Sequence, residues 1–180
     1  MYVNIMDIFD KLDDITKKHS ENVSMLVKGF SKKINMYSLD LFLGALFHDI
    51  GKLYIPKAIL LKKGKLTKEE MDIIKLHPEY GIDILNDTVY KDNNVIYNCI
   101  KYHHLKYNGE GSYPKSNLLY IDIPIETRIT TICDSYDAMT TDRGYNKVLS
   151  KEEALKSLIL DKGTKLDPRL VDKFILYLNN

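Results

Sequence analysis

The chain has 180 residues, of which 44% are apolar and 28% charged, and its 26 basic and 25 acidic side chains leave a net charge of +1. These values fit one globular domain of ordinary size and exclude a broad positive surface that captures polymeric DNA or RNA. No apolar run approaches the roughly 20 residues that span a bilayer, and the two cysteines, Cys99 and Cys133, lack metal-type spacing, so we expect buried thiols in a cytoplasmic protein.

The N-terminal quarter of the chain is predicted to be helical. Apolar residues recur close to a helical period over residues 3–17, and the aspartates among them exclude a signal peptide. A second helical pattern covers residues 19–30. Ser38 is placed to cap a third helix, which is apolar nearly all round over residues 39–47. Such a helix is expected to be central and buried.

Capping signals mark the helices of the remaining chain. Thr67 with Glu70, and Ser150 with Glu153, have the spacing of a capping box, and Asp167 precedes a first-turn proline. The predicted helices after residue 66 cover residues 67–77, 78–85, 92–104 with Asp92 as the cap, 124–139, 150 onward and 167–178, with an irregular stretch at 105–123 and a polar loop at 140–149. No strand alternation, repeat or domain boundary is evident. We therefore predict one all-α domain, residues 1–180, as a bundle of about seven to nine helices.

The chemistry begins at the end of the apolar helix, where His48 and Asp49 are followed by Gly51 and Lys52. Adjacent side chains on a helix point about 100° apart, so two neighbouring ligands at a helix end can still converge on one ion. A carboxylate can also bind one metal with each oxygen, and Lys52 adds a cation for phosphate. Because His-Asp pairs also arise by chance or in capping, the pair alone marks only a candidate metal site.

Five histidines lie on or at the edges of predicted helices: His19, His48, His77, His103 and His104. Each one taken singly is more often a hydrogen-bonded structural histidine than a metal ligand. Together with Asp49 and Asp134 they form a donor set of nitrogen and oxygen without thiolate, which favours iron or manganese over structural zinc. Two such ions bridged by a carboxylate can activate water and hold a phosphodiester.

The order and spacing of the motifs resemble the HD-GYP family, the cyclic-di-GMP phosphodiesterase branch of the HD metal-dependent phosphohydrolases. The resemblance runs from about residue 19 to residue 174. It rests on His19-Ser20, His48-Asp49-Ile50-Gly51-Lys52, Ile55-Pro56, Gly64-Lys65-Leu66-Thr67, His77-Pro78, His103-His104, Ile123-Pro124, Asp134-Ser135-Tyr136-Asp137, Asp142-Arg143, Gly163-Thr164 and Asp167-Pro168.

The resemblance implies two divalent metal ions, iron or manganese, bridged by Asp49. It implies that His19, His48 and Asp134 complete the shell of one ion, and that His77, His103 and His104 complete the other. It also implies a catalytic Lys52 beside the scissile phosphate, and substrate contacts from Lys52, Tyr113, Arg143 and the nearby Lys147. The alternatives are a solvated lysine at Lys52, a packing tyrosine at Tyr113 and an ordinary loop arginine at Arg143.

The sequence departs from the family pattern mainly in the signature loop. Leu105 replaces a glutamate, Asn108 replaces an aspartate, Ser112 separates Gly111 from Tyr113, Asn146 replaces a basic residue, and Ile15 stands where members with three metals carry a glutamate. The metal ligands are intact while the loop is altered. The departures therefore bear on substrate preference and turnover more than on metal binding.

Three functions follow as expectations. The first is hydrolysis of cyclic-di-GMP to the linear dinucleotide, with GMP as a further product left open, by a two-metal mechanism in which a bridging hydroxide attacks in line. The second is an HD phosphohydrolase that acts on another nucleotide, and the third is a catalytically weak nucleotide-binding or interaction module. The complete ligand set and Lys52 favour an enzyme, whereas the altered loop favours the second and third. Expected partners are the cyclic dinucleotide and a second copy of the chain or a regulatory protein, without polymeric nucleic acid or a membrane.

Overall fold

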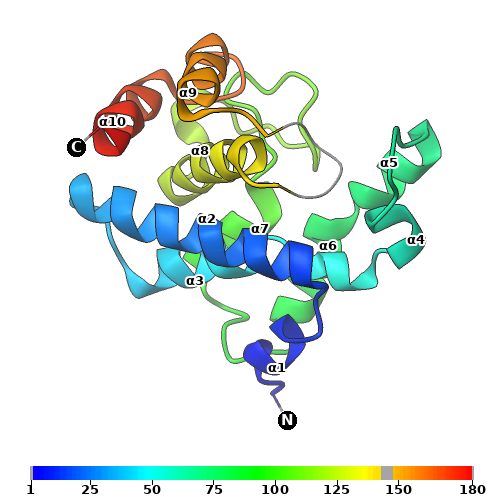
Figure 1. Ribbon diagram of the computed structural model, residues 1–180. Helices are drawn as coiled ribbons and strands as arrows, with labels where there is room; N and C mark the ends of the chain where they lie inside the picture. The colour runs from blue at the N-terminus through cyan, green and yellow to red at the C-terminus, as the bar shows by residue number, and fades with distance from the viewer. Residues whose placement is uncertain (1, 143–147, 180) are drawn as a thin grey trace.

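A computed structural model describes residues 2–142 and 148–179 (Figure 1). These residues form ten α-helices, of which α1 (Ile5–Phe9) and α4 (Lys57–Leu60) have only five and four residues. The eight longer helices agree with the predicted number. Within the described ranges there is no β-strand, only two isolated bridges, so the predicted all-α fold is confirmed.

The N-terminal prediction of one helix over residues 3–17 is wrong. Helix α1 ends at Phe9, and α2 spans Asp14–Lys33 as one continuous helix that includes the second predicted stretch. The break is at Asp13, whose side chain accepts a hydrogen bond from the Thr16 N–H at 3.0 Å and caps α2. In Figure 1, α2 crosses the molecule between α3 (Leu39–Phe47) and α8 (Ile125–Thr140).

Helix α3 is central, as its apolar sequence predicts. The Leu41 N–H donates to the Ser38 hydroxyl at 3.0 Å, which confirms the predicted cap. Leu41 and Ala45 belong to a core cluster with residues of α2, α8 and α10, whereas Leu46 and Phe47 belong to a second cluster with residues of α1, α6 and α7. The end of α3, where the His-Asp pair lies, is therefore packed from both sides.

The remaining α-helices follow the predicted order closely. They are α5 (Lys68–Ile74), α6 (His77–Asn86), α7 (Asn94–Tyr102), α9 (Lys151–Leu160) and α10 (Pro168–Leu178). Two short 3-10 helices, η1 (Ile50–Tyr54) and η2 (Tyr120–Asp122), were not predicted. Both capping boxes and the Asp167 cap are confirmed. The predicted Asp92 cap is wrong, because the Asn93 side chain accepts hydrogen bonds from the Val95 and Ile96 N–H groups in the first turn of α7, at 3.1 Å each.

Several features of the core agree with the composition. Cys99 and Cys133 are buried and form no disulfide, as expected. Among the described residues, every helix is too short or too polar to cross a membrane.

Part of the predicted polar loop 140–149 lies outside the described part of the chain, namely residues 143–147. The predicted substrate contacts Arg143 and Lys147 are among these residues.

Candidate metal centre and pocket

Asp49 lies at the junction of α3 and η1 and is almost completely buried. Its Oδ2 atom is 2.5 Å from Lys52 Nζ, 3.4 Å from His48 Nε2 and 3.6 Å from His19 Nε2. Its Oδ1 atom faces another pair of imidazoles, at 3.2 Å from His77 Nε2 and 3.7 Å from His103 Nε2. The two oxygens of one carboxylate therefore point at two different groups of histidines.

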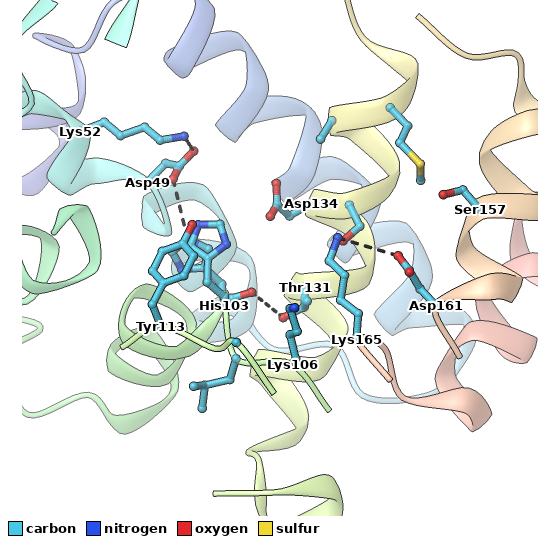
Figure 2. A pocket seen from close by; sticks show the side chains of 16 residues that line it. Asp49, Lys52, His103, Lys106, Tyr113, Thr131, Asp134, Ser157, Asp161 and Lys165 are labelled. Carbon is cyan, nitrogen blue, oxygen red and sulfur yellow. Dashed lines mark hydrogen bonds and ion pairs between the residues drawn. The ribbon is translucent and has the colours of Figure 1, made fainter. Parts of the chain in front are cut away.

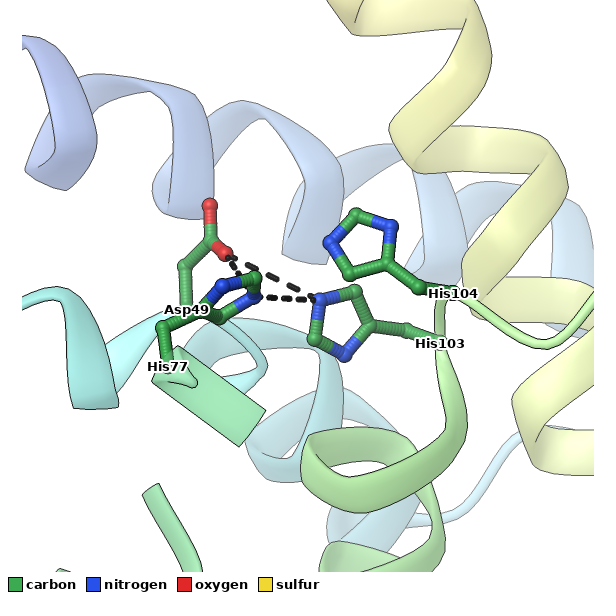
Figure 3. A group of neighbouring side chains, drawn as sticks. All are labelled: Asp49, His77, His103 and His104. Carbon is green, nitrogen blue, oxygen red and sulfur yellow. Dashed lines mark hydrogen bonds and ion pairs between the residues drawn. The ribbon is translucent and has the colours of Figure 1, made fainter. Parts of the chain in front are cut away.

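The first group consists of Asp49, His77, His103 and His104, whose donor atoms all lie within 4.8 Å of one another. Figure 3 shows these side chains pointing toward a common point, with His103 and His104 coming from the end of α7. His77 lies at the start of α6, and its Nε2 is 3.1 Å from His103 Nε2. Two helices and the end of α3 thus supply four potential ligands.

The second group consists of His19, His48 and Asp49, again within 4.8 Å. His19 comes from the middle of α2 and His48 from the end of α3. Asp134 on α8 joins them, because its Oδ1 lies 3.0 Å from His19 Nε2. The structure thus gathers the other six predicted ligands around Asp49.

Hydrogen bonds on the far side of each ring orient three of the histidines. The Nδ1 atoms of His48 and His77 lie 2.7 Å from the backbone oxygens of Ala45 and Ile74, respectively. The Nδ1 of His103 lies 3.0 Å from two carbonyl oxygens of α7. A carbonyl only accepts, so we assign the proton to Nδ1 in each ring. The Nε2 lone pairs are then left to face Asp49.

This tautomer assignment provides a test of whether the residues fit a cation. The Nε2 atoms of His77 and His103 then both present lone pairs to each other and to Asp49 Oδ1. The buried His48 Nε2 and Asp49 Oδ1 accordingly make no hydrogen bond. Buried acceptors that face one another without a donor are costly. A divalent ion between them would satisfy all of these atoms, so the donor set fits metal binding.

The protonation states of His103, His104 and Asp49 also suit a metal. Burial, assisted by the neighbouring His48 and His77, lowers the pKa of His103 to about 3. Burial likewise lowers the pKa of His104 well below its ordinary value. Burial opposes the ionisation of Asp49, but Lys52 and His48 outweigh it and hold the pKa of this carboxyl well below its usual range. Neutral imidazoles and ionised carboxylates are the forms that bind divalent ions.

His19 has a further partner, Asp137, which the sequence reasoning did not assign. The His19 Nδ1 lies 2.6 Å from the buried Asp137 Oδ2. Asp137 is three residues after Asp134 on α8, so both carboxylates lie on one face of that helix. That spacing from a predicted ligand is the signal that could have identified Asp137.

A pocket of about 370 Å³ opens beside the metal centre. Asp49, Lys52 and Asp134 lie on one side of it, and Ser157 and Asp161 lie on the other (Figure 2). The pocket is therefore positioned to hold a molecule that reaches the candidate metal site.

Tyr113 enters this pocket from the irregular stretch and stacks on His104, with ring centroids 4.4 Å apart and planes inclined by 25°. Ser112, the additional residue before it, accepts a hydrogen bond from the Lys106 N–H at 2.8 Å. The loop is also tied to the α9–α10 connection, where the Asn108 N–H donates to the Thr164 oxygen at 2.9 Å. The altered loop therefore has backbone contacts of its own and brings Tyr113 next to His104, one of the candidate metal ligands.

These features define the class of protein. A His-Asp pair at the end of a buried helix, joined by histidines from the surrounding helices, is the arrangement that the motifs predicted for an HD domain. The HD domain family matches residues 3–170. The chain belongs to this family, which confirms the family assignment made from the sequence.

Three curated relatives extend the comparison. The cyclic di-GMP phosphodiesterase response regulator RpfG of Xanthomonas campestris is 37% identical over 133 residues, which cover 74% of this chain and 35% of the relative. The 3'3'-cGAMP-specific phosphodiesterase 2 of Vibrio cholerae is 40% identical over 125 residues, covering 69% and 24%. A cyclic di-GMP phosphodiesterase of Thermotoga maritima is 32% identical over 177 residues, covering 96% and 48%. The chain thus spans less than half the length of these relatives.

Two solved structures share the fold. Bd1817, an HDG"Y"P protein from Bdellovibrio bacteriovorus, has a TM-score of 0.72 at 24% identity and covers 95% of this chain and 54% of its own. The PgpH HD domain of L. monocytogenes, in complex with cyclic-di-AMP, has a TM-score of 0.65 at 23% identity, with 96% and 95% covered. At these identities the likeness supports the fold alone.

Proposed function

We propose that the chain is a metal-dependent phosphodiesterase that hydrolyses cyclic dinucleotides. The observation that carries the proposal is the position of Asp49, whose oxygens face two groups of imidazoles while Lys52 Nζ lies 2.5 Å from Oδ2. The adjoining pocket gives a phosphodiester access to this centre. The names of the relatives support the substrate class.

The more specific substrate that we propose is cyclic-di-GMP, opened to the linear dinucleotide and then to GMP. Two of the three relatives described above carry this substrate in their names, whereas the third is specific for 3'3'-cGAMP. The altered loop supports a second candidate, hydrolysis of another nucleotide, because Leu105 and Ser112 change the edge of the pocket. A weakly catalytic binding module is the third.

We propose two divalent ions, iron or manganese, as cofactors. Asp49 would bridge them, His77, His103 and His104 would hold one, and His19, His48 and Asp134 would hold the other. Ions bound here would supply Lewis-acid activation of water and positive charge for the phosphoryl oxygens. The nitrogen and oxygen donor set favours these metals over a structural zinc.

The protein's own groups would act on the substrate as follows. Lys52, held by Asp49 at the pocket wall, would bind a non-bridging phosphoryl oxygen and stabilise the charge that develops there. Burial raises the pKa of the Tyr113 phenol, so its hydroxyl would remain protonated and donate a hydrogen bond. Its stacking on His104 would hold the ring at the pocket edge. Arg143 and Lys147 remain proposed substrate contacts outside the described residues.

The organisation of the protein is part of the proposal. We propose that residues 1–180 act as one HD domain in the cytoplasm. A second copy of the chain or a regulatory protein is the expected partner besides the substrate. Sedimentation of the purified chain, with and without cyclic-di-GMP, would test self-association.

The test of the function begins with anaerobic purification and elemental analysis. The metal-loaded protein is then incubated with cyclic-di-GMP, 3'3'-cGAMP, cyclic-di-AMP and the corresponding linear dinucleotides, and the products are separated by chromatography. We expect hydrolysis of at least one cyclic dinucleotide, and its loss on chelation with recovery on adding manganese or ferrous iron. Two bound ions without turnover of any cyclic dinucleotide would contradict the proposal and favour the binding module.

A further inference from the structure

The wall of the pocket opposite Asp49 has no role in the chemistry proposed above. This wall is formed by Ser157 on α9, Asp161 at the C-cap of α9 and Lys165 from the α9–α10 connection (Figure 2). Ser157 and Asp161 are four residues apart and therefore lie on the same face of α9. Lys165 Nζ lies 4.0 Å from Asp161 Oδ2, so a carboxylate and an ammonium are side by side at the edge of the pocket.

These polar groups are available to a ligand. Among the described residues, the side chains of Ser157, Asp161 and Lys165 make no hydrogen bond and no ion pair other than the one at 4.0 Å. The Lys165 and Asp161 side chains are 42% and 37% exposed. An ion pair of this length and exposure contributes little to stability, so a bound molecule could engage both groups at small cost.

The surface between this wall and the metal centre is partly apolar. Ala138 and Met139 of α8, one turn beyond Asp134, line the same pocket. A small methyl and a flexible thioether provide a surface on which a planar aromatic ring can lie. The pocket therefore offers, in sequence, a phosphate-binding centre, an apolar surface and a polar edge, which matches the order of phosphate, base face and base edge in a nucleotide.

We infer that Asp161 and Lys165 read the edge of a purine base and select guanine over adenine, an inference that rests on the proposed function. A carboxylate accepts from both the N1–H and the N2 amino group of guanine, and a lysine donates to the adjacent O6. Adenine presents an acceptor at N1 and an amino donor where guanine has O6. It would face Asp161 with an unprotonated nitrogen and Lys165 with another donor, so both contacts would be lost.

A charge effect is the competing explanation of any Asp161 phenotype, because a carboxylate in this pocket also repels the substrate's phosphates. Asp161→Asn distinguishes the two. It removes the charge and replaces one acceptor oxygen by a donor amino group of the same size. Relief of repulsion would strengthen the binding of every nucleotide, whereas loss of base reading would weaken the binding of guanine nucleotides alone.

The experiment is calorimetric titration of the metal-loaded protein with GMP and with AMP, which carry the same phosphate and differ in the base. We expect the wild type to bind GMP about tenfold more tightly than AMP, in line with one partly exposed bidentate contact, and Asp161→Asn to abolish that ratio. Asp172→Asn is the matched control, because Asp172 pairs with Lys162 at 2.6 Å, away from the pocket. It should leave the ratio unchanged.

The inference is overturned if the wild type binds both nucleotides equally, or if Asp161→Asn changes both affinities by the same factor. The readout does not require turnover, so its outcome is separate from that of the proposed function. A protein that prefers GMP through Asp161 but cleaves no cyclic dinucleotide would uphold the inference and overturn the function. If the wild type hydrolyses cyclic-di-GMP and cyclic-di-AMP with equal kcat/KM, the proposed function is upheld and the inference about guanine selection is overturned.

Discussion

The Nδ1 atom of His19 lies 2.6 Å from the Oδ2 atom of Asp137, and both side chains are buried. The other oxygen of Asp137 accepts a hydrogen bond from the Thr141 hydroxyl at 2.7 Å. Burial opposes ionisation of Asp137, but the bonds from His19 and Thr141 outweigh it and lower the pKa of the carboxyl. The carboxylate thus fixes the His19 ring and leaves its Nε2 facing Asp134 and Asp49.

Replacing Asp137 by Asn should weaken metal binding without unfolding the protein. The amide can keep one hydrogen bond to His19 but supplies no charge, and loss of such outer partners typically costs about 10–100-fold in metal affinity. Titration with Mn²⁺, followed by calorimetry, measures the change. Asp83→Asn, on the exposed face of α6, is the control. Wild-type affinity for both ions in Asp137→Asn would refute the positioning role.

Asp49→Ala should abolish both activity and most metal binding. The substitution removes the proposed bridge and its charge, and it leaves imidazole lone pairs facing one another. We expect two ions per wild-type chain, because seven ligands are gathered and Ile15 supplies no carboxylate for a third ion. Elemental analysis of the two proteins gives the metal content. A mutant that retains two ions, or a wild type that holds three, would contradict this assignment.

Lys52→Ala should retain metal but lose turnover. The ammonium is placed to stabilise charge on the phosphoryl oxygens, and one preorganised charge partner contributes about 10²–10³-fold to kcat. The Lys52 side chain is mostly buried and lines the pocket, so its loss leaves the solvent-exposed surface largely unchanged. Steady-state hydrolysis, normalised to metal content, tests the effect. Full activity of the mutant on the true substrate would exclude a role at the phosphate.

The altered loop is expected to limit hydrolysis of cyclic-di-GMP. Ser112 lengthens the segment before Tyr113 by up to about 3.5 Å, which is expected to shift Tyr113 relative to a bound cyclic dinucleotide. A shift of a substrate contact by about 1 Å can lower the rate by 10²-fold. We predict weak turnover of cyclic-di-GMP by the natural sequence. The linear dinucleotide or a simple phosphodiester reporter should be cleaved at least as well.

Deleting Ser112 together with Leu105→Glu and Asn108→Asp should raise cyclic-di-GMP turnover with metal content unchanged. Ser112→Ala is the control for the deletion, because it removes the hydroxyl that accepts from the Lys106 N–H but keeps the loop length. The rates of cyclic-di-GMP hydrolysis by the wild type, the repaired variant and Ser112→Ala separate the effect of loop length from that of the lost hydroxyl. If the natural sequence is already as fast as the repaired variant, the loop argument fails.

Gly51→Ala should destabilise the protein by about 3 kcal/mol or more, at the upper end for overpacking. A Cβ atom at Gly51 would lie 1.9 Å from the His77 oxygen and 2.4 Å from the Gly81 nitrogen, so α6 would have to move. Gly64→Ala is the comparison, because it meets no atom within 4 Å and is strained only by its φ of +116°. It should cost about 1 kcal/mol. Urea unfolding measures both, and equal effects would contradict the packing argument.

The helices were predictable where local signals determine them. Thr67, Ser150 and Asp167 form caps within three residues of their own position, so short sequence patterns suffice. The break at Asp13 was missed because the apolar stripe continues across it and outweighs one polar residue in a periodicity argument. Asp92 was predicted as the cap in place of Asn93 because aspartate and asparagine have similar N-cap propensities. Only the backbone geometry shows which of the two neighbouring residues caps the helix.

The residues of the candidate site also differ in how far the sequence could predict them. The seven candidate ligands could be proposed from the sequence, because their residue types and spacing are distinctive and resemble a known family. Asp137 was not assigned, because an aspartate that orients a ligand carries no mark other than its place on the helix face. Asp161 and Lys165 could not be found from the sequence, since their place in the pocket depends on how α9 packs across from the end of α3, more than 100 residues away.

The backbone oxygens that contact His48, His77 and His103 belong to the last turns of α3, α5 and α7. In the last turn of a helix, carbonyl oxygens have no intrahelical hydrogen-bond partner. An ion at the proposed centre would therefore join three helix termini that are remote in sequence. Fraying at any one of them would withdraw a ligand from the shared site, so metal release and local melting of these termini would be thermodynamically coupled.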